Sequence, residues 1–269
     1  MVNVKKLDGS MQKYDASKLK RSLLNSGADN ETAEGVVKKA EKILYEGIET
    51  RKLFKFVFKE FKKIQPYTAL KYDLKNAILR LGPEGFVFEK FVSEILKKQG
   101  YSVKLNQIIK GEHIRHEIDI IAVKEKEKLM VESKYHTKPW LGCDIQTALY
   151  VYARFLDVKQ HFTVPVLVTN TKFSRQVVDY AKGVGLWLMG WKFPQDNSVE
   201  KNIEHFKLYP ITMLSMLSRD EAKTLLASNV ILVKDLLSKD INEIAGILKA
   251  PKSKIEKILK QAEALVSSV

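Results

Sequence analysis

The sequence is poor in cysteine and has neither a long hydrophobic run nor a glycine-rich phosphate loop, and each absence excludes a class of protein. Cys143 is the single cysteine, which excludes a disulfide framework or a thiolate metal cluster and fits a reducing compartment. No apolar run approaches the roughly 18 residues of a membrane span. The polar start, MVNVKKLDGS, does not resemble a secretory signal. We therefore expect a cytoplasmic protein without a membrane partner.

Acidic residues are outnumbered by basic ones. The chain has 46 Lys and Arg against 32 Asp and Glu, a net charge of +14 at pH 7. An excess of this size indicates a polyanionic partner, although a lysine-rich solvated surface explains it equally well. Residues 1–82 carry 18 basic and 10 acidic residues, residues 83–208 carry 19 and 15, and residues 209–269 carry 9 and 7. Most of the excess therefore lies in the first region.

The same three regions differ in pattern, and we predict a multidomain chain with one domain in each: 1–82, 83–208 and 209–269. The first begins with a short β-hairpin, VNVKKLDGSMQKYD, and continues as helices. The second alternates helices with short β-branched runs, which predicts an α/β mixed sheet. The third contains short helices only. Three residues are expected to be helix N-caps: Thr50, Ser218 and Ser253.

Carboxylates interrupt two apolar runs in HEIDIIAVKEKEKLMVESKYH, residues 116–136. The runs flank the charged turn KEKEK and predict a β-hairpin. Glu132 and Lys134 are two residues apart, so they project from the same face of the second strand. Asp119 projects from the first strand, and the turn would bring it close to Glu132.

Two carboxylates at close range repel one another unless a cation lies between them. Mg²⁺ fits, because it prefers oxygen ligands and lowers the pKa of a bound water. A nearby lysine can neutralise charge that develops on a phosphate. The group is thus suited to metal-assisted phosphodiester hydrolysis, and the alternative is an exposed hairpin with a surface ion pair.

Residues 83–192 resemble the Mrr-like branch of the restriction-endonuclease-like superfamily. The resemblance rests on GFVFEKFVSEILKKQGY, HEIDIIA, VESKYH, DIQTALYVYARF and VTNTKFSRQVVDYAKGVGLWL, which occur in the family's order. It implies a PD-(D/E)xK nuclease in which Asp119 and Glu132 hold Mg²⁺ and Lys134 is catalytic. The carbonyl of Ser133 would be a further metal ligand.

The resemblance also implies roles for residues on two helices. Glu89 would support the metal site, and Gln146 matches a glutamine typical of the branch. Tyr150 and Arg154 follow Gln146 at i+4 and i+8, so one face would look at the site or at DNA. Two histidines flank the motif and could contact the site or phosphate, or be ordinary surface residues: His116 and His136.

VKKLDGSMQKYDASKLKRSLLNSG, with YEGIETRKL further on, resembles the ATP-cone, a nucleotide-sensing domain. The resemblance covers residues 2–80 and implies ATP or dATP as a regulatory ligand. Lys6 and Lys18 match the family's phosphate-binding lysines, while Leu7 replaces a basic residue for which Lys5 could substitute. Three further residues are candidates for ribose, base or phosphate contacts: Gln12, Asp15 and Thr50. The charge of this region could also add to a DNA-binding surface.

Residues 218–266 resemble tandem helix-hairpin-helix units, which present backbone N–H groups to DNA phosphates. Asn229 and Ala250 stand near the usual hairpin glycines, and asparagine tolerates the left-handed backbone. Lys252 and Lys254 could reach phosphates. The alternative is an all-α bundle for protein contacts or dimerisation.

We therefore expect a Mg²⁺-dependent DNA endonuclease that ATP or dATP regulates, assembled as a homodimer or a higher homo-oligomer. Two alternatives remain open. One is a nucleotide-sensing regulator that binds DNA without cutting it. The other is a structure-selective repair nuclease, which the helix-hairpin-helix resemblance favours.

Overall fold

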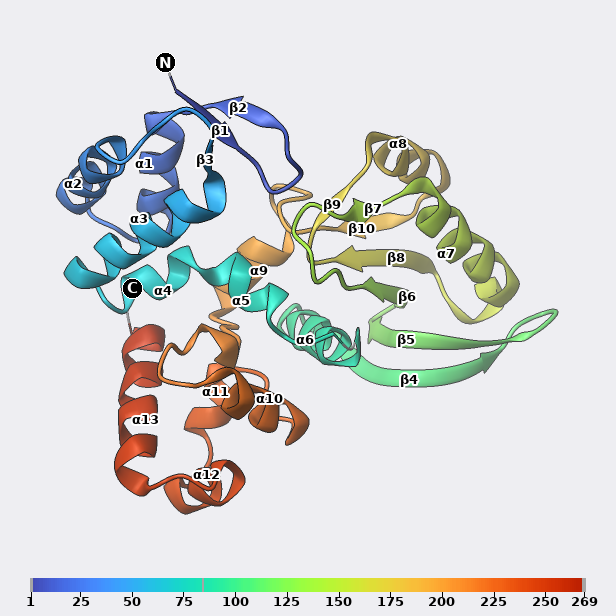
Figure 1. The fold of residues 1–269 in the computed structure, drawn as a ribbon. Helices are drawn as coiled ribbons and strands as arrows, with labels where there is room; N and C mark the ends of the chain where they lie inside the picture. The colour runs from blue at the N-terminus through green and yellow to red at the C-terminus, as the bar shows by residue number, and fades with distance from the viewer. Residues whose placement is uncertain (1, 84, 268–269) are drawn as a thin grey trace. The chain divides into compact units, whose positions relative to one another are not determined.

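The structure is a computed structural model that describes residues 2–83 and 85–267 (Figure 1). The chain forms two compact units. One unit consists of the residues up to Ala77, Ile211–Ala222 and the chain from Leu236 on, and the other of Ile78–Pro210 and Lys223–Asp235. The division into three domains stays a prediction. Among the described residues, no helix combines the length and apolar character needed to cross a bilayer.

The first unit begins with the predicted hairpin. β1 (Asn3–Lys5) and β2 (Met11–Lys13) are antiparallel, and β3 (Ile48–Glu49) pairs with β1 in parallel. Gly9 has φ 85, a left-handed conformation that glycine adopts without steric cost, so Asp8-Gly9 makes the turn. The hairpin prediction is confirmed.

Three helices complete this part of the first unit: α1 (Ala16–Asn25), α2 (Asn30–Glu41) and α3 (Thr50–Ile64). Their buried residues form one core, which includes Leu23, Val36 and Phe61. The N-cap prediction for Thr50 is wrong, because Thr50 is already helical and Glu49 precedes the helix without a side-chain cap. Short helices follow: α4 (Thr68–Tyr72) and α5 (Leu74–Leu79).

The second unit contains a five-stranded mixed sheet in the order β10-β8-β6-β5-β4. β4 (Ser102–Lys110), β5 (Arg115–Lys124) and β6 (Glu127–Lys134) are antiparallel neighbours, which confirms the predicted 116–136 hairpin. β8 (Val164–Thr169) and β10 (Trp187–Met189) continue the sheet in parallel with β6. The α/β mixed sheet is therefore confirmed.

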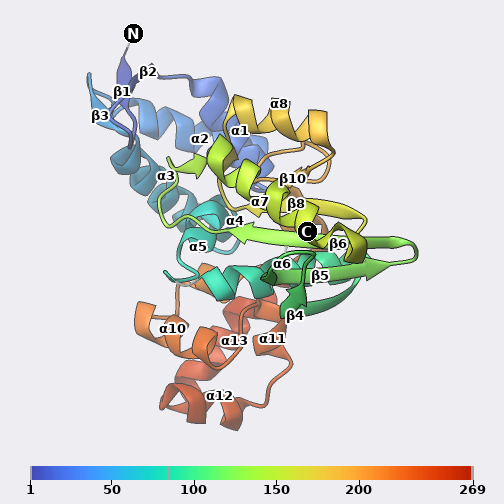
Figure 2. The ribbon, with the colours of Figure 1, turned by 90° about the vertical axis from the view of Figure 1, so that its right-hand side faces the viewer.

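Helices cover both faces of this sheet (Figures 1 and 2). α7 (Ile145–Val158) and α8 (Arg175–Val184) lie on one face, and α6 (Gly85–Lys98) lies on the other. These three helices fall where their sequences predict them. Gly100 ends the α6 region with φ 94.

Several elements of the second unit are not predicted from the sequence. The sequence reading left out β4, and also β7 (Gly142–Cys143) and β9 (Lys172–Phe173), which form a small parallel sheet. α9 (Val199–Phe206) packs beside α6. The β4 omission matters most, because this strand carries a residue of the candidate site.

The C-terminal region is helical, as predicted. Its helices are α10 (Arg219–Ala227), α11 (Val233–Leu237), α12 (Ile241–Leu248) and α13 (Lys252–Ser267). Ser218 Oγ accepts the Glu221 N–H at 3.2 Å, which confirms Ser218 as the N-cap of α10. Ser253 is wrong as an N-cap, because α13 already begins at Lys252. Among the described residues of this region, the left-handed non-glycine residues are Asn229 (φ 63), as expected, and Lys249 (φ 48), which directly precedes Ala250.

Candidate active site

The adjacent strands β5 and β6 bring two acidic residues together. The last pair of their ladder is Ile120 with Val131, and one further step places Asp119 level with Glu132. The Ser133 N–H donates to Asp119 Oδ2 at 2.8 Å, which fixes the Asp119 carboxylate against β6. Both side chains are half-buried. The proximity that the hairpin predicted is thus present.

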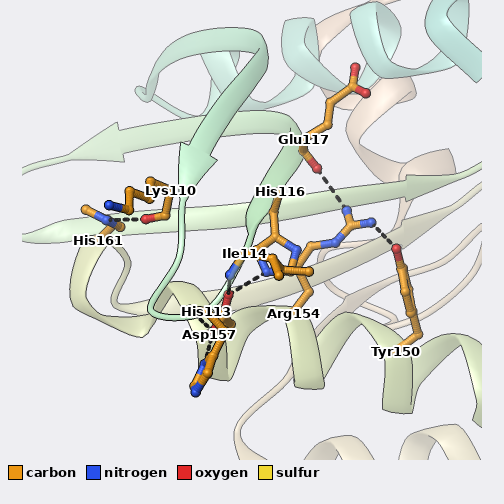
Figure 3. A network of polar contacts seen from close by, with 9 residues as sticks. All are labelled: Lys110, His113, Ile114, His116, Glu117, Tyr150, Arg154, Asp157 and His161. Atoms are coloured by element: carbon orange, nitrogen blue, oxygen red, sulfur yellow. Dashed lines mark hydrogen bonds and ion pairs between the residues drawn. The ribbon is translucent and has the colours of Figure 1, made fainter.

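Arg154 on α7 binds the second carboxylate. Its Nη1 donates to Glu132 Oε2 at 2.5 Å, and the two side chains are only 12% and 17% exposed. Arg154 also donates from Nη1 to the Glu117 carbonyl at 3.0 Å and from Nη2 to Tyr150 Oη at 2.6 Å (Figure 3). These contacts fix the guanidinium, so Glu132 has a permanent cationic neighbour.

A third carboxylate approaches from α6, held by a residue that the sequence reading missed. Asn106 Nδ2 donates to Glu89 Oε2 at 3.1 Å. Asn106 lies between the pairs Leu105–Ile120 and Gln107–Ile118, level with Asp119, and has a left-handed φ of 48°. A non-glycine residue with positive φ inside a strand is strained. Asparagine is the residue type that tolerates it best, so a mid-strand Asn was the available signal.

Lys134 supplies an ammonium without a fixed partner. It is exposed on β6, two residues beyond Glu132, and its carbonyl accepts a bond from Thr169 Oγ1 at 2.7 Å. Its positive charge opposes the rise in pKa that burial causes at Asp119 and Glu132. Within the described ranges 2–83 and 85–267, Lys134 forms no ion pair. The amine can therefore interact with a bound substrate.

Burial raises the pKa of all three carboxylates, and the charge of Asp119 adds to the rise at Glu132 and Glu89. Burial, and then the negative charge of Asp119, raise the pKa of Glu132 to about 7, although Arg154 and Lys134 oppose this. Burial raises the pKa of Asp119, and burial together with Asp119 raises that of Glu89. Arg154 and Lys134 thus leave the negative charge incompletely compensated, which is the condition in which a further cation is favoured.

The donor set fits Mg²⁺. Asp119 and Glu132 offer hard oxygen ligands, and the Ser133 carbonyl is the next backbone oxygen on β6. In the described part of the chain, no three His, Cys, Asp or Glu side chains are arranged to hold a metal ion. Two carboxylates and a carbonyl are nevertheless compatible with Mg²⁺, which usually keeps several waters.

Gln146 stands apart from this cluster. It is exposed in the first turn of α7, about two turns before Arg154, and its side chain makes no hydrogen bond with any described residue. Two residues of the predicted α7 face therefore belong to the site. Arg154 bonds to Glu132 directly, and Tyr150 is connected to the site by its bond with Arg154. Gln146 is left facing solvent.

The two flanking histidines contact other groups. His116 Nε2 lies 2.8 Å from Asp157 Oδ2, and His113 Nδ1 lies 2.5 Å from Asp157 Oδ1 (Figure 3). Asp157 also accepts the His113 N–H at 2.9 Å, so this α7 carboxylate fastens the turn between β4 and β5. His136 is bonded through its backbone to Asn170, and its Nε2 lies 3.7 Å from Cys143 Sγ.

Gly111 in the same turn should tolerate no side chain. A Cβ there would lie 2.7 Å from Asp157 Cγ and 2.9 Å from its carbonyl oxygen. We expect Gly111→Ala to lower the free energy of unfolding by about 1–3 kcal/mol, because the contact forces Asp157 off the turn. Gly183→Ala on α8, where a Cβ meets nothing within 4 Å, is the control and should not destabilise. Equal stability of the two variants in chemical denaturation would contradict this account.

The residues predicted to bind nucleotide lie on the N-terminal hairpin and the helices after it. Lys5, Lys6 and Lys18 are exposed. Asp15 is the N-cap of α1 and accepts the Lys18 N–H at 3.1 Å, so its carboxylate already has a structural role. Two others are half-buried: Gln12 on β2 and Thr50 at the start of α3.

The two lysines predicted to bind phosphate in the C-terminal region differ in their exposure and their ion pairing. Lys252 is exposed at the start of α13. Lys254 is paired with Glu221 at 2.5 Å, and this ion pair links α13 to α10. Lys254 therefore has a structural role in this structure.

Comparisons with known proteins agree with this architecture. Residues 82–190 match the family model for the Mrr-type restriction endonuclease, and residues 209–266 match the model for the C-terminal region of AF1548-like proteins. Neither of these two models covers residues 1–81.

Two relatives extend the match. An uncharacterized protein of Archaeoglobus fulgidus is 33% identical over 176 residues, which are 65% of this chain and 99% of that protein. The crystal structure of AF1548, a protein of unknown function, is similar with a TM-score of 0.60 and 31% identity, over 69% of this chain and 100% of that one. The chain therefore belongs to the AF1548-like family, and its residues 82–190 are a restriction-endonuclease-like domain of the Mrr type.

Proposed function

We propose that the protein is a Mg²⁺-dependent DNA endonuclease with its active site at Asp119, Glu132 and Lys134. One observation carries the proposal: in a restriction-endonuclease-like domain, two mutually repelling carboxylates stand beside a lysine that forms no ion pair among the described residues. The Arg154–Glu132 ion pair neutralises only part of the negative charge, so the remainder favours a cation, and the Lys134 ammonium is available to a phosphate.

Each residue has a distinct role in this proposal. Three groups would hold the metal ion: the carboxylates of Asp119 and Glu132 and the carbonyl of Ser133. Glu89 would support this site as the third carboxylate of the cluster. When bound, Mg²⁺ polarises a phosphoryl oxygen and makes water more acidic. Lys134 donates to the scissile phosphate, where negative charge grows in the transition state. Arg154 keeps Glu132 in position, and Gln146, exposed on α7, contacts the DNA.

The N-terminal region would regulate the activity, and the C-terminal region would bind DNA. We propose the three domains 1–82, 83–208 and 209–269, with ATP or dATP binding to the first through Lys6 and Lys18. Nucleotide would shift the equilibrium between two conformations or assemblies by binding one of them more tightly than the other. The third would hold DNA phosphates in the manner of helix-hairpin-helix units, supported by the left-handed Asn229 and Lys249. A homodimer would place two active sites on a duplex.

Cleavage of a panel of substrates tests the function. Supercoiled plasmid, methylated plasmid and a branched duplex are incubated with the full chain in Mg²⁺ or EDTA, each with and without ATP and dATP. We expect Mg²⁺-dependent strand breaks that respond to nucleotide. Cleavage restricted to the branched duplex would favour the repair nuclease. Binding without cleavage of any substrate would favour the non-cutting regulator.

A further inference from the structure

α3 is an amphipathic helix whose outer side is entirely basic. Its inner side buries Leu53, Val57 and Phe61 in the core that it shares with α1 and α2. At about 100° per residue, five basic residues fall within one sector of about 100° on the opposite side. One of them, Lys62, is half-buried and donates to Ser215 Oγ at 2.9 Å. The other four are exposed and define the α3 basic face: Arg51, Lys52, Lys55 and Lys59.

The α3 basic face lacks counter-charges. Glu60 is the one acidic residue of α3, and it is buried and engaged by Lys39 and Lys63. Within residues 2–83 and 85–267, none of the four basic residues is ion-paired. The core of the unit is packed by the other side of the helix, so the four side chains play no part in it.

Two features of this arrangement weaken the helix. Arg51, Lys55 and Lys59 follow at i, i+4 and i+8, where like charges repel. Arg51 and Lys52 lie in the first turn, where the helix dipole favours acidic residues, and the first turn of α3 has none. Local rules that are broken without a compensating contact in the fold indicate a functional site. An anion would remove both penalties.

The form of the face indicates which anion. Arg51, Lys55 and Lys59 are spaced by about 6 Å along the helix axis, a line of charges about 12 Å long. A triphosphate needs donors that converge, whereas a duplex backbone presents a line of charges about every 3.4 Å along each strand. We propose that the α3 basic face docks on the phosphate backbone of duplex DNA and holds it without reading its sequence. This rests on the proposed function only in taking DNA as the substrate.

The test compares two quadruple variants of the full chain in Mg²⁺-free buffer. One is Arg51→Gln, Lys52→Gln, Lys55→Gln and Lys59→Gln, because glutamine keeps the helix propensity while removing the charge. The control removes four exposed lysines elsewhere: Lys98→Gln, Lys126→Gln, Lys182→Gln and Lys201→Gln. The affinity for a fluorescent duplex is measured by anisotropy at several salt concentrations, and circular dichroism verifies folding.

We expect the α3 variant to bind at least tenfold more weakly at low salt. Its plot of log affinity against log salt should be shallower by about 3–4, since each lost phosphate contact removes about 0.9 from the slope. The control should change the slope by less than one unit. Equal slopes for the two variants would overturn the proposal. So would loss of ATP binding in the α3 variant with an unchanged DNA slope, because the face would then serve nucleotide.

The outcomes separate this inference from the nuclease proposal. If the wild type binds DNA through the α3 basic face but cuts no substrate, the docking surface stands and the enzyme reading fails. If the wild type cuts DNA and the two slopes are equal, the enzyme reading stands and the docking surface fails. A wild type that binds no duplex at any salt concentration contradicts the docking surface directly.

Discussion

Lys134→Ala is expected to lower the rate of DNA cleavage by about 10²–10³-fold, the usual cost of removing one donor to developing charge. The ammonium is exposed beside Asp119 and Glu132, and it carries no described ion pair, so its removal should leave the fold intact. Single-turnover rates on plasmid measure the effect. Mg²⁺ binding, measured by calorimetry, should persist, because the lysine repels the metal ion.

Lys138→Ala is the matched control for this variant. Lys138 is exposed four residues further on, and its ammonium lies 5.7 Å from the Trp140 ring centre. Its loss should leave cleavage within a few-fold of wild type. Equal rates for the two lysine variants would show that Lys134 does not act on the phosphate.

Glu132→Gln should change how stability depends on pH in the metal-free protein. The folded state raises the pKa of Glu132 from 4.5 to about 7, so it holds this proton more tightly than the unfolded chain does. The corresponding stability is fully present below about pH 4.5, declines between pH 4.5 and 7, and is lost above pH 7. Glutamine cannot ionise, so the variant escapes this loss.

The expected size follows from the shift. Between pH 4 and pH 8 in EDTA, the difference in unfolding free energy should move by about 3 kcal/mol in favour of Glu132→Gln. Saturating Mg²⁺ should narrow the gap at pH 8 by stabilising only the wild type. Glu125→Gln, in the exposed turn of the same hairpin, should follow the wild type. Parallel stability curves for the wild type and Glu132→Gln would mean that burial and the charge of Asp119 do not raise the pKa of Glu132.

The elements that the sequence predicted well are those with strong local signals. The KEKEK turn between β-branched runs predicts β5 and β6, and period-3.6 apolar patterns predict α6, α7 and α8. Spacing on strands then placed Asp119 near Glu132. β4 was overlooked even though its exposed and half-buried residues alternate along SVKLNQIIK, because its polar face carries lysines and asparagine.

What the sequence did not predict depends on contacts between distant segments. Helical spacing placed Arg154 on a face with Tyr150, but only the packing of α7 on the sheet joins it to Glu132 across 22 positions. Nothing local shows that His116 binds Asp157, 41 positions away. The Thr50 and Ser253 errors are shifts of one or two positions at helix ends, where local signals are weakest.

The measurement that tests the central claim most directly is the nicking of supercoiled plasmid in Mg²⁺ by the wild type and by Asp119→Asn, purified side by side. The substitution would keep the size of the side chain and an oxygen acceptor for the Ser133 N–H, but would remove the charge that holds the metal ion. We predict nicking by the wild type that EDTA abolishes, and none by the variant. Equal nicking by both proteins, or intact DNA binding with no nicking by the wild type, would contradict the assignment of this site.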